Sequence, residues 1–166
     1  EAHSFPTRRS SDLTIGYLYR DPSVLTVLKD RVVELYNSDG SVPASVIAEL
    51  SDDGYHAWHR LHDWVLAAPD EASANDLNAR AERLVASFES ERARATDLIP
   101  GAAEAIAIIA TVVPVGIVSS NATSAVKAAL TAARIENLFK YVGGRETDPF
   151  SPKNLKPNPS QLELAI

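Results

Sequence analysis

A short apolar run, Val115-Gly116-Ile117-Val118, constrains the fold of this chain more than any other feature. It follows Pro114 and precedes the polar stretch Ser119-Ser120-Asn121, so it has the length of a strand and is too short for a helix. An uninterrupted apolar run of this kind is typical of a strand that is buried on both faces of a parallel sheet. We therefore expect a buried strand that ends at Val118 and a polar turn over 119–121.

The segments around this run predict a βαβ unit. A helix of small and apolar residues over 102–110 precedes it, and an Ala-rich helix over about 123–133 follows the polar turn. Leu138 to Val142 suits a second strand, which Gly143-Gly144 is expected to end. Because strands that alternate with helices form parallel sheets, we expect residues 99–166 to adopt an α/β fold.

The preceding region, about residues 20–98, has only helical patterns. Helices are expected over about 22–38, in a short piece from Ser41, over 55–66 after a break at Gly54, and over 73–95. In the last of these, apolar residues recur along one stripe, namely Leu77, Leu84, Val85 and Phe88. The charged residues between them are expected on the solvent side: Glu82, Arg83, Glu89 and Arg92.

Composition excludes several classes of function. The net charge is −6, and no stretch interleaves Lys or Arg with aromatic residues, so we expect no nucleic-acid binding. The chain has no Cys, which excludes disulfides, thiolate metal sites and a Cys nucleophile. The longest apolar run, over 105–118, is interrupted by polar, Pro and Gly residues and is shorter than the ~20 residues that span a bilayer. We expect no membrane segment, and a cytoplasmic location is the default.

The first residues differ from the rest of the chain. Residues 3–13 are basic and Ser-rich and have no helical or strand period, and their sequence resembles the translation of a short-read sequencing adapter. We therefore expect residues 1–13 to be an artefactual, disordered leader and leave them out of the fold argument. The chain also holds no Met, so we expect it to be a fragment of a longer reading frame.

Two features could carry chemistry. Ser119, Ser120 and Asn121 follow the first strand and precede a helix, where strand ends and helix N-terminal N–H groups favour a bound phosphate. The alternative is that these residue types serve only as the N-cap of that helix. The second feature is Lys156, which lies before Pro157 and the last expected helix and could reach a phosphate oxygen as a point charge. Its alternative is an exposed loop lysine.

The order of these motifs resembles the haloacid-dehalogenase-like hydrolases of the phosphoglycolate phosphatase type. The resemblance rests on motifs within about residues 98–166: Ile99-Pro100-Gly101, Val115 to Ser119, Ile135 to Phe139, Val142-Gly143-Gly144 and Lys156-Pro157-Asn158-Pro159. Residues 14–98 resemble the inserted helical cap of that family by length and position. Residues 99–166 would be a partial Rossmann-like α/β core with the second and third motifs.

The resemblance implies a function and a site. The family hydrolyses small phosphomonoesters through an aspartyl-phosphate intermediate and uses Mg²⁺, so the implied partner is a small phosphorylated metabolite. Within this pattern Ser119 binds the transferring phosphoryl group and Lys156 neutralises charge on that group and on the nucleophile. Ser120 and Asn121 flank the same group and are expected to contribute phosphate-binding backbone and side-chain groups.

The sequence also departs from the family pattern. The first motif is Asp-x-Asp-Gly-Thr after a strand, and no Asp-x-Asp is present in this chain. The fourth motif, an acidic pair that completes the Mg²⁺ site, is not reached before Ile166. We therefore expect a family member truncated at both ends, and we expect the chain as given to be inactive. The loop from Gly144 to Lys156 is also longer than the family pattern. Lys153 fits the third motif less well than Lys156, because no Pro follows Lys153.

Other interpretations remain open at this point. Dehalogenases, phosphonatases and sugar-phosphate mutases of the same family have residues that correspond to Ser119 and Lys156, so these activities remain alternatives. A receiver-like phospho-accepting module also places Ser or Thr and Lys-Pro after successive strands, although the separation here is wide, and a packing or regulatory module is a third class. His56, His59 and His62 are spaced by three, which spreads them over a helix face, so a solvated or cap-hinge face is expected there rather than a metal site. The sequence does not indicate an oligomeric state.

Overall fold

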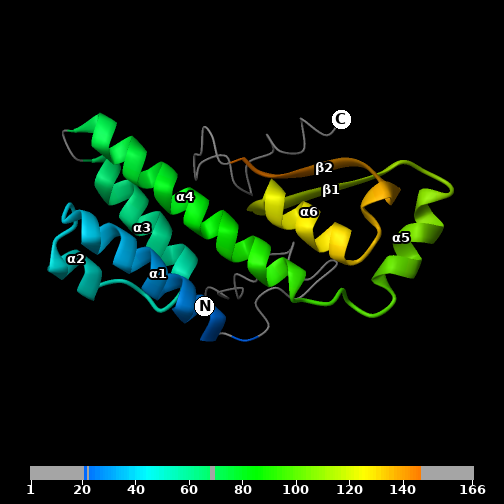
Figure 1. Cartoon of the computed structure of the whole chain (residues 1–166), viewed down its shortest axis with the longest axis horizontal. Coiled ribbons are helices and arrows are strands. Elements are labelled where there is room, and N and C mark those ends of the chain that lie inside the picture. The colour runs from blue at the N-terminus through cyan, green and yellow to red at the C-terminus, as the bar shows by residue number, and fades with distance from the viewer. Residues whose placement is uncertain (1–20, 22, 68–69, 147–166) are drawn as a thin grey trace, which may run out of the picture.

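The helices and strands form two groups that one long helix joins (Figure 1). The computed structural model describes residue 21, residues 23–67 and residues 70–146. In chain order the elements are α1 (Ser23–Asp39), α2 (Ala44–Ala48), α3 (Gly54–Leu66), α4 (Glu71–Arg94), α5 (Ala102–Ala110), β1 (Val115–Ala122), α6 (Thr123–Ala132), the 3₁₀ helix η2 (Glu136–Leu138) and β2 (Phe139–Arg145). The described part of the chain is mixed α/β and mostly helical, and it contains a two-stranded parallel sheet. The expected α/β class is confirmed, whereas the described residues do not form a full Rossmann-like core.

The first group is a helical bundle of α1, α3 and α4 around one apolar core. Its largest fully buried side chains are Trp58, Tyr36, Leu28, Leu61 and Leu77. These residues recur at helical spacing in three helices, so each helix turns one apolar stripe toward the others. The helices expected over about 22–38, 55–66 and 73–95 are confirmed, with ends that differ by one or two residues.

The expected break between the short helix and the next one lies over 49–53, and Gly54 is already the first residue of α3. The carboxylate of Asp53 caps the helix by accepting hydrogen bonds from the backbone N–H groups of Tyr55 and His56, at 2.8 and 3.1 Å. A Cβ atom at Gly54 would lie 2.7 Å from the Leu25 carbonyl oxygen and 2.8 Å from Leu28 Cβ. Glycine stands here because the start of α3 lies directly against α1.

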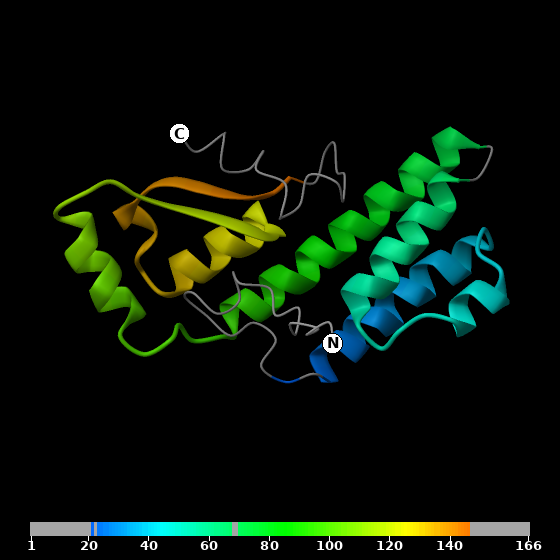
Figure 2. The same cartoon turned by 180° about the vertical axis from the view of Figure 1, so that it is seen from behind.

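Helix α4 belongs to both groups. Leu77 and Val85 lie in the core of the bundle, while Ala86 and Ala93, further along the helix, pack against Ala125 of α6. Figure 2 shows from behind how α4 leaves the bundle and runs beside α6. Small side chains at this crossing let the two helices approach closely.

The second group is built around the unit β1–α6–β2. The two strands pair in parallel, with Val118 opposite Gly143 and Ala122 opposite Arg145. Between these two pairs β1 has the longer path, so it bulges over Ser119–Asn121. The strand therefore continues to Ala122, and the turn expected over 119–121 is wrong.

Burial along β1 also differs from the expected pattern. In the apolar run Gly116 is exposed and its neighbours are half-buried, whereas the residues from Ser119 to Ala122 are all buried. The polar end of the strand lies inward because α4 and α6 both pack against it. The most enclosed part of the sheet is therefore the part that carries the polar side chains.

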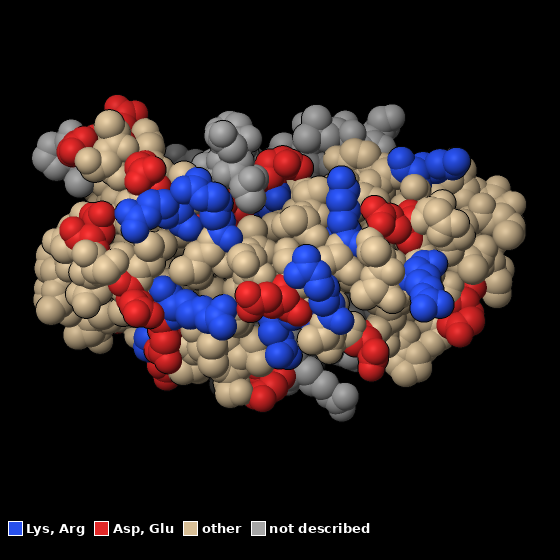
Figure 3. All heavy atoms as spheres, viewed as in Figure 1, with Lys and Arg blue, Asp and Glu red and all other residues tan. Residues whose placement is uncertain are grey.

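The surface carries both signs of charge. On the face drawn in Figure 3, Lys and Arg side chains alternate with Asp and Glu side chains, and neither sign forms a continuous patch. Exposed apolar side chains gather at the end of α5 and in the turn after it, at Ile108, Ile109, Val112 and Val113. None of the helices in the described ranges is long and apolar enough to cross a membrane.

Candidate functional site

The carboxyl end of β1 carries three of the four expected site residues. Ser119, Ser120 and Asn121 are 6%, 8% and 5% exposed, and all three lie in the bulge just before α6 begins at Thr123. Lys156, the fourth, lies outside the described residues, so its convergence with Ser119 stays a prediction. The strand ends and the helix N-terminus meet at one place, as the sequence indicated for a phosphate site.

Side chains hydrogen-bond to several backbone groups of the bulge. The hydroxyl oxygen of Ser119 accepts a hydrogen bond from the Asn121 N–H at 3.1 Å. The N-cap position of α6 is Ala122, which makes no side-chain cap. The alternative that the polar residues serve as the N-cap of this helix is therefore wrong.

The end of β2 approaches the bulge very closely. A Cβ atom at Gly144 would lie 2.6 Å from the Asn121 carbonyl oxygen and 2.7 Å from the Thr123 nitrogen. Thr123 links the two segments, because its hydroxyl accepts from the Gly144 N–H at 3.1 Å and donates to Glu146 at 2.8 Å. The expected end of the second strand at Gly143-Gly144 is wrong, since β2 continues through both glycines to Arg145.

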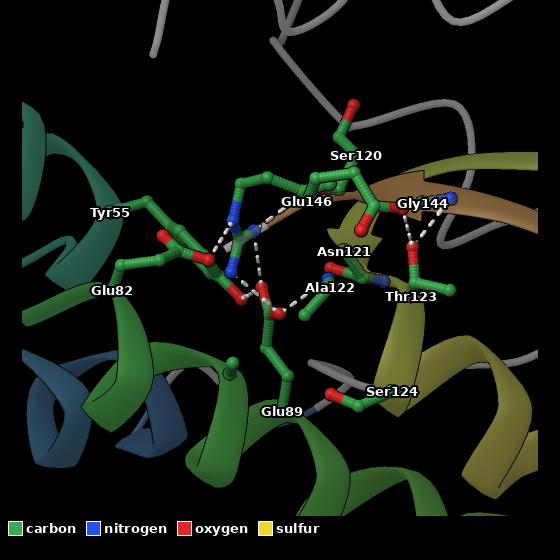
Figure 4. A network of polar contacts seen from close by, with 12 residues as sticks. Tyr55, Glu82, Glu89, Ser120, Asn121, Ala122, Thr123, Ser124, Gly144 and Glu146 are labelled. Carbon is green, nitrogen blue, oxygen red and sulfur yellow. Dashed lines mark hydrogen bonds and ion pairs between the residues drawn. The ribbon is translucent and has the colours of Figure 1, made fainter. Parts of the chain in front are cut away.

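A buried ion-pair network lies between this strand end and the helical bundle (Figure 4). Arg145 of β2 donates from Nε to Glu82 at 2.8 Å and from its two terminal nitrogens to Glu89 at 3.0 and 2.9 Å. The Arg145 guanidinium also lies over the Trp58 ring, with its Cζ 5.0 Å from the ring centroid. Arg145 is 2% exposed and the two glutamates are 0% exposed, so the expected solvent-side placement of Glu82 and Glu89 is wrong.

Burial and pairing shift the pKa values within this network. Burial raises the pKa of Glu82 to about 7, although the charge and the hydrogen bond of Arg145 oppose the shift. Burial alone would lower the pKa of Arg145, but the adjacent Glu89 and Glu82 carboxylates outweigh it and raise that pKa. Arg145 therefore stays charged, and Glu82 titrates near neutral pH.

Glu82 is also incompletely paired. Its Oε1 atom accepts from Arg145, while its Oε2 atom is buried and has no hydrogen-bond partner among the described residues. Two carboxylates facing one guanidinium leave one negative charge without a counter-charge in the network. Incomplete hydrogen bonding and the uncompensated charge both favour protonation of Glu82 over ionisation.

The described residues do not fit a Mg²⁺ site. Magnesium is usually held by one or two carboxylates together with water and substrate phosphate, but here Glu82 and Glu89 pair with Arg145 and Glu146 accepts from Thr123. No group of three or more His, Cys, Asp or Glu side chains in the described ranges could hold a metal ion. We therefore derive no chemical step through a metal.

The histidine triplet of α3 does not share one environment. His56 is exposed, and His62 is buried, which lowers its pKa through desolvation. The solvated face expected for the triplet is therefore wrong for His62. Its side chain lies within the bundle, 3.4 Å from Asp63.

The network of Glu82, Glu89 and Arg145 was missed by the sequence argument, although one pattern pointed to it. Glu82 and Glu89 are two helical turns apart, with Val85 between them on the same face of α4. Carboxylates on a buried stripe need a partner, and Arg145 follows two glycines at the end of a strand. Nothing in the local sequence connects residues that are 56 and 63 positions apart.

Comparisons with known proteins add no further assignment. The sequence matches no protein-family model and no curated protein, and no solved structure matches the fold. The site is therefore judged on its own geometry and on the motifs in the sequence.

Proposed function

We propose that this chain is the phosphoryl-binding part of a haloacid-dehalogenase-like phosphatase that hydrolyses a small phosphomonoester. The observation that supports the proposal best is the position of Ser119. It lies in a buried bulge at the carboxyl end of β1, beside the parallel strand β2 and at the N-terminus of α6. Ligands in parallel α/β sheets bind at this end of the strands.

Ser119 is suited to donate to a phosphoryl oxygen. Its hydroxyl oxygen already accepts from the Asn121 N–H, and that bond does not use the hydroxyl hydrogen. The hydroxyl can therefore be donated while its oxygen stays fixed, which orients the bound group at little entropic cost. The ten-residue helix α6 begins next to it, and its first N–H groups and its dipole favour an anion.

The proposed reaction needs groups that lie beyond the described site. A carboxylate attacks phosphorus, the alcohol leaves as the phosphorus–oxygen bond to it breaks, and water then hydrolyses the acyl phosphate to release inorganic phosphate. Lys156 is proposed to offset charge on the phosphoryl oxygens. Ser119 holds one of those oxygens through both steps, while Ser120 and Asn121 shape the wall of the site.

A phosphate titration tests the binding site. In ¹H–¹⁵N spectra of the chain, inorganic phosphate should shift the amide signals of residues 119–123, and Ser119→Ala should weaken binding about tenfold because one charge-assisted hydrogen bond is lost. Thr96→Ala is the matched control, because the half-buried Thr96 hydroxyl donates to the Arg92 carbonyl oxygen in α4. Absence of phosphate-dependent shifts, or equal affinity in Ser119→Ala, would overturn the proposed site.

The same preparation is expected to bind without turnover. No Asp-x-Asp is present in the chain, so no carboxylate pair of that pattern can attack phosphorus and transfer protons. We expect no release of p-nitrophenol from p-nitrophenyl phosphate with Mg²⁺ above the rate without protein. Metal-dependent turnover that Ser119→Ala abolishes would contradict this expectation and would require a nucleophile elsewhere in the chain.

A further inference from the structure

We propose that Glu89 is a positioning residue for the phosphate site, because it fixes the backbone of the bulge from the helical bundle. The inference rests on the proposed function, since it assigns a role toward the phosphate that Ser119 would bind. Glu89 does not lie in the motifs that suggested that function. Its role follows from its contacts.

The carboxylate of Glu89 touches the bulge directly. Its Oε2 atom accepts from the Ala122 N–H at 2.7 Å, and its Oε1 atom accepts from the Tyr55 hydroxyl at 2.6 Å. Both oxygens also receive hydrogen bonds from Arg145. The carboxylate is thus held from α3 and from β2, so the position it imposes on Ala122 is rigid.

Arg145 also hydrogen-bonds to the backbone of the bulge. One of its terminal nitrogens donates to the Ser120 carbonyl oxygen at 2.8 Å as well as to Glu89. The Glu89–Arg145 pair therefore binds two backbone groups, the Ser120 carbonyl and the Ala122 N–H, which lie on either side of Asn121 (Figure 4). Asn121 supplies the N–H that Ser119 accepts, so the pair also determines where the Ser119 hydroxyl lies.

The bulge needs this support because the sheet does not provide it. The regular pairing of β1 with β2 is interrupted between Val118 and Ala122, so the strand partner does not fix the backbone there. All of these groups are buried, and water cannot replace the missing partners without opening the structure. An unpaired backbone N–H at Ala122 would favour a different bulge conformation.

Glu82 provides a matched control for Glu89. Both glutamates lie on α4, both are 0% exposed, and both pair with Arg145. Among the described residues Glu82 accepts only from Arg145, whereas Glu89 also accepts from the backbone of the bulge. Removing either carboxylate leaves Arg145 with one carboxylate partner, and only Glu89→Met also removes the acceptors of the Ala122 N–H and of the Tyr55 hydroxyl.

The test compares Glu89→Met with Glu82→Met in the phosphate titration and in amide hydrogen exchange. We expect Glu89→Met to weaken inorganic phosphate binding about tenfold relative to Glu82→Met and to speed exchange of the Ala122 amide by at least about tenfold, because one buried hydrogen bond is lost. Glu89→Gln keeps an oxygen that can accept from Ala122, so it should restore most of the affinity and the protection. This rescue would not follow from a merely structural role of the buried charge.

The outcomes separate this inference from the proposed function. If the wild-type chain binds no phosphate, the proposed function fails, and the inference fails with it as a statement about phosphate. If the wild-type chain binds phosphate but Glu89→Met and Glu82→Met lose affinity equally, only the role of Glu89 is overturned. If Glu89→Met does not fold, Glu89→Gln provides the test. A loss of phosphate affinity in Glu89→Gln while the Ala122 amide stays protected from exchange would overturn the role of Glu89.

Discussion

Glu82 makes the stability of the protein depend on pH. Its pKa is about 7 in the folded protein and near 4.5 when unfolded, so folding favours the protonated form. The stability that this provides is fully present below pH 4.5 and is lost as the pH rises through 7. Because Gln stays neutral, the free energy of unfolding of Glu82→Gln relative to wild type should rise by on the order of 3 kcal/mol between pH 5 and pH 8.

Urea unfolding at the two pH values measures this difference. The charged and titratable groups that act on Glu82 are Arg145 on β2 and Glu89 on α4, and Tyr36 on α1 senses its charge. Burial lowers the pKa of His62, so its protonation destabilises the fold at low pH in both proteins and cancels in the comparison. Glu91→Gln, at an exposed glutamate of the same helix, is the matched control. A difference for Glu82→Gln that does not change with pH would contradict the prediction.

At the scale of the residue, the sequence predicts where polar side chains lie better than it predicts which groups they pair with. Ser119, Ser120 and Asn121 were expected at the carboxyl end of a strand and lie there. The burial of Glu82 and Glu89 was not predicted, because a helical pattern does not reveal what packs against a face. A charged residue on such a face is solvated by default, and only a distant arginine changes that.

At the scale of the element, Gly54 sets the distance between α1 and α3. Gly54→Ala should improve helix propensity by about 1 kcal/mol, yet the new methyl would lie 2.7 Å from the Leu25 carbonyl oxygen and the Lys29 nitrogen. The clash with backbone atoms should outweigh the gain, so we expect a net loss of about 1–3 kcal/mol in the free energy of unfolding.

Thermal and urea unfolding of Gly54→Ala measure this loss. Gly116→Ala is the matched control, because a Cβ atom there would meet Tyr141 Cβ at 3.6 Å, an ordinary contact. It should change stability by less than about 1 kcal/mol. A Gly54→Ala variant more stable than wild type would show that propensity outweighs packing at this helix start.

Elements were easier to predict than their ends. The sequence predicts that Gly143-Gly144 end β2 and that Gly54 precedes α3, because glycine has the weakest preference for strand and helix. In both places tertiary packing reversed that preference: Gly54 and Gly144 are where two backbones approach too closely for a side chain. The polar end of β1 stayed in the strand for a related reason, since the Glu89–Arg145 pair supplies the hydrogen bonds that solvent would give a turn.

On the scale of the whole molecule, α4 makes one structure of the bundle and the sheet. One part of the helix contributes Leu77 and Val85 to the bundle core, and a later part packs Ala86 and Ala93 on α6. The ion pairs of Glu82 and Glu89 with Arg145 lie at the same junction. Loss of α4 would open the core of the bundle and would uncover Ala125 of α6, so the described part of the chain should unfold in one transition.

The crossing of α4 and α6 offers the sharpest test of that coupling. Ala125 is 1% exposed at the crossing, so Ala125→Leu should push the helices apart and cost about 1–3 kcal/mol. Trp58 and Trp64 both lie in α3, so fluorescence reports on the bundle, while amide exchange in β1 and β2 reports on the sheet. In wild type, fluorescence and amide exchange should give the same free energy of unfolding. In Ala125→Leu, the free energy of opening measured by amide exchange in the sheet should be lower than the free energy of unfolding measured by fluorescence in the bundle. Ala132→Leu, at an exposed position of α6, should leave both free energies unchanged. If Ala125→Leu and Ala132→Leu gave the same free energies, the crossing of α4 and α6 would not couple the bundle to the sheet.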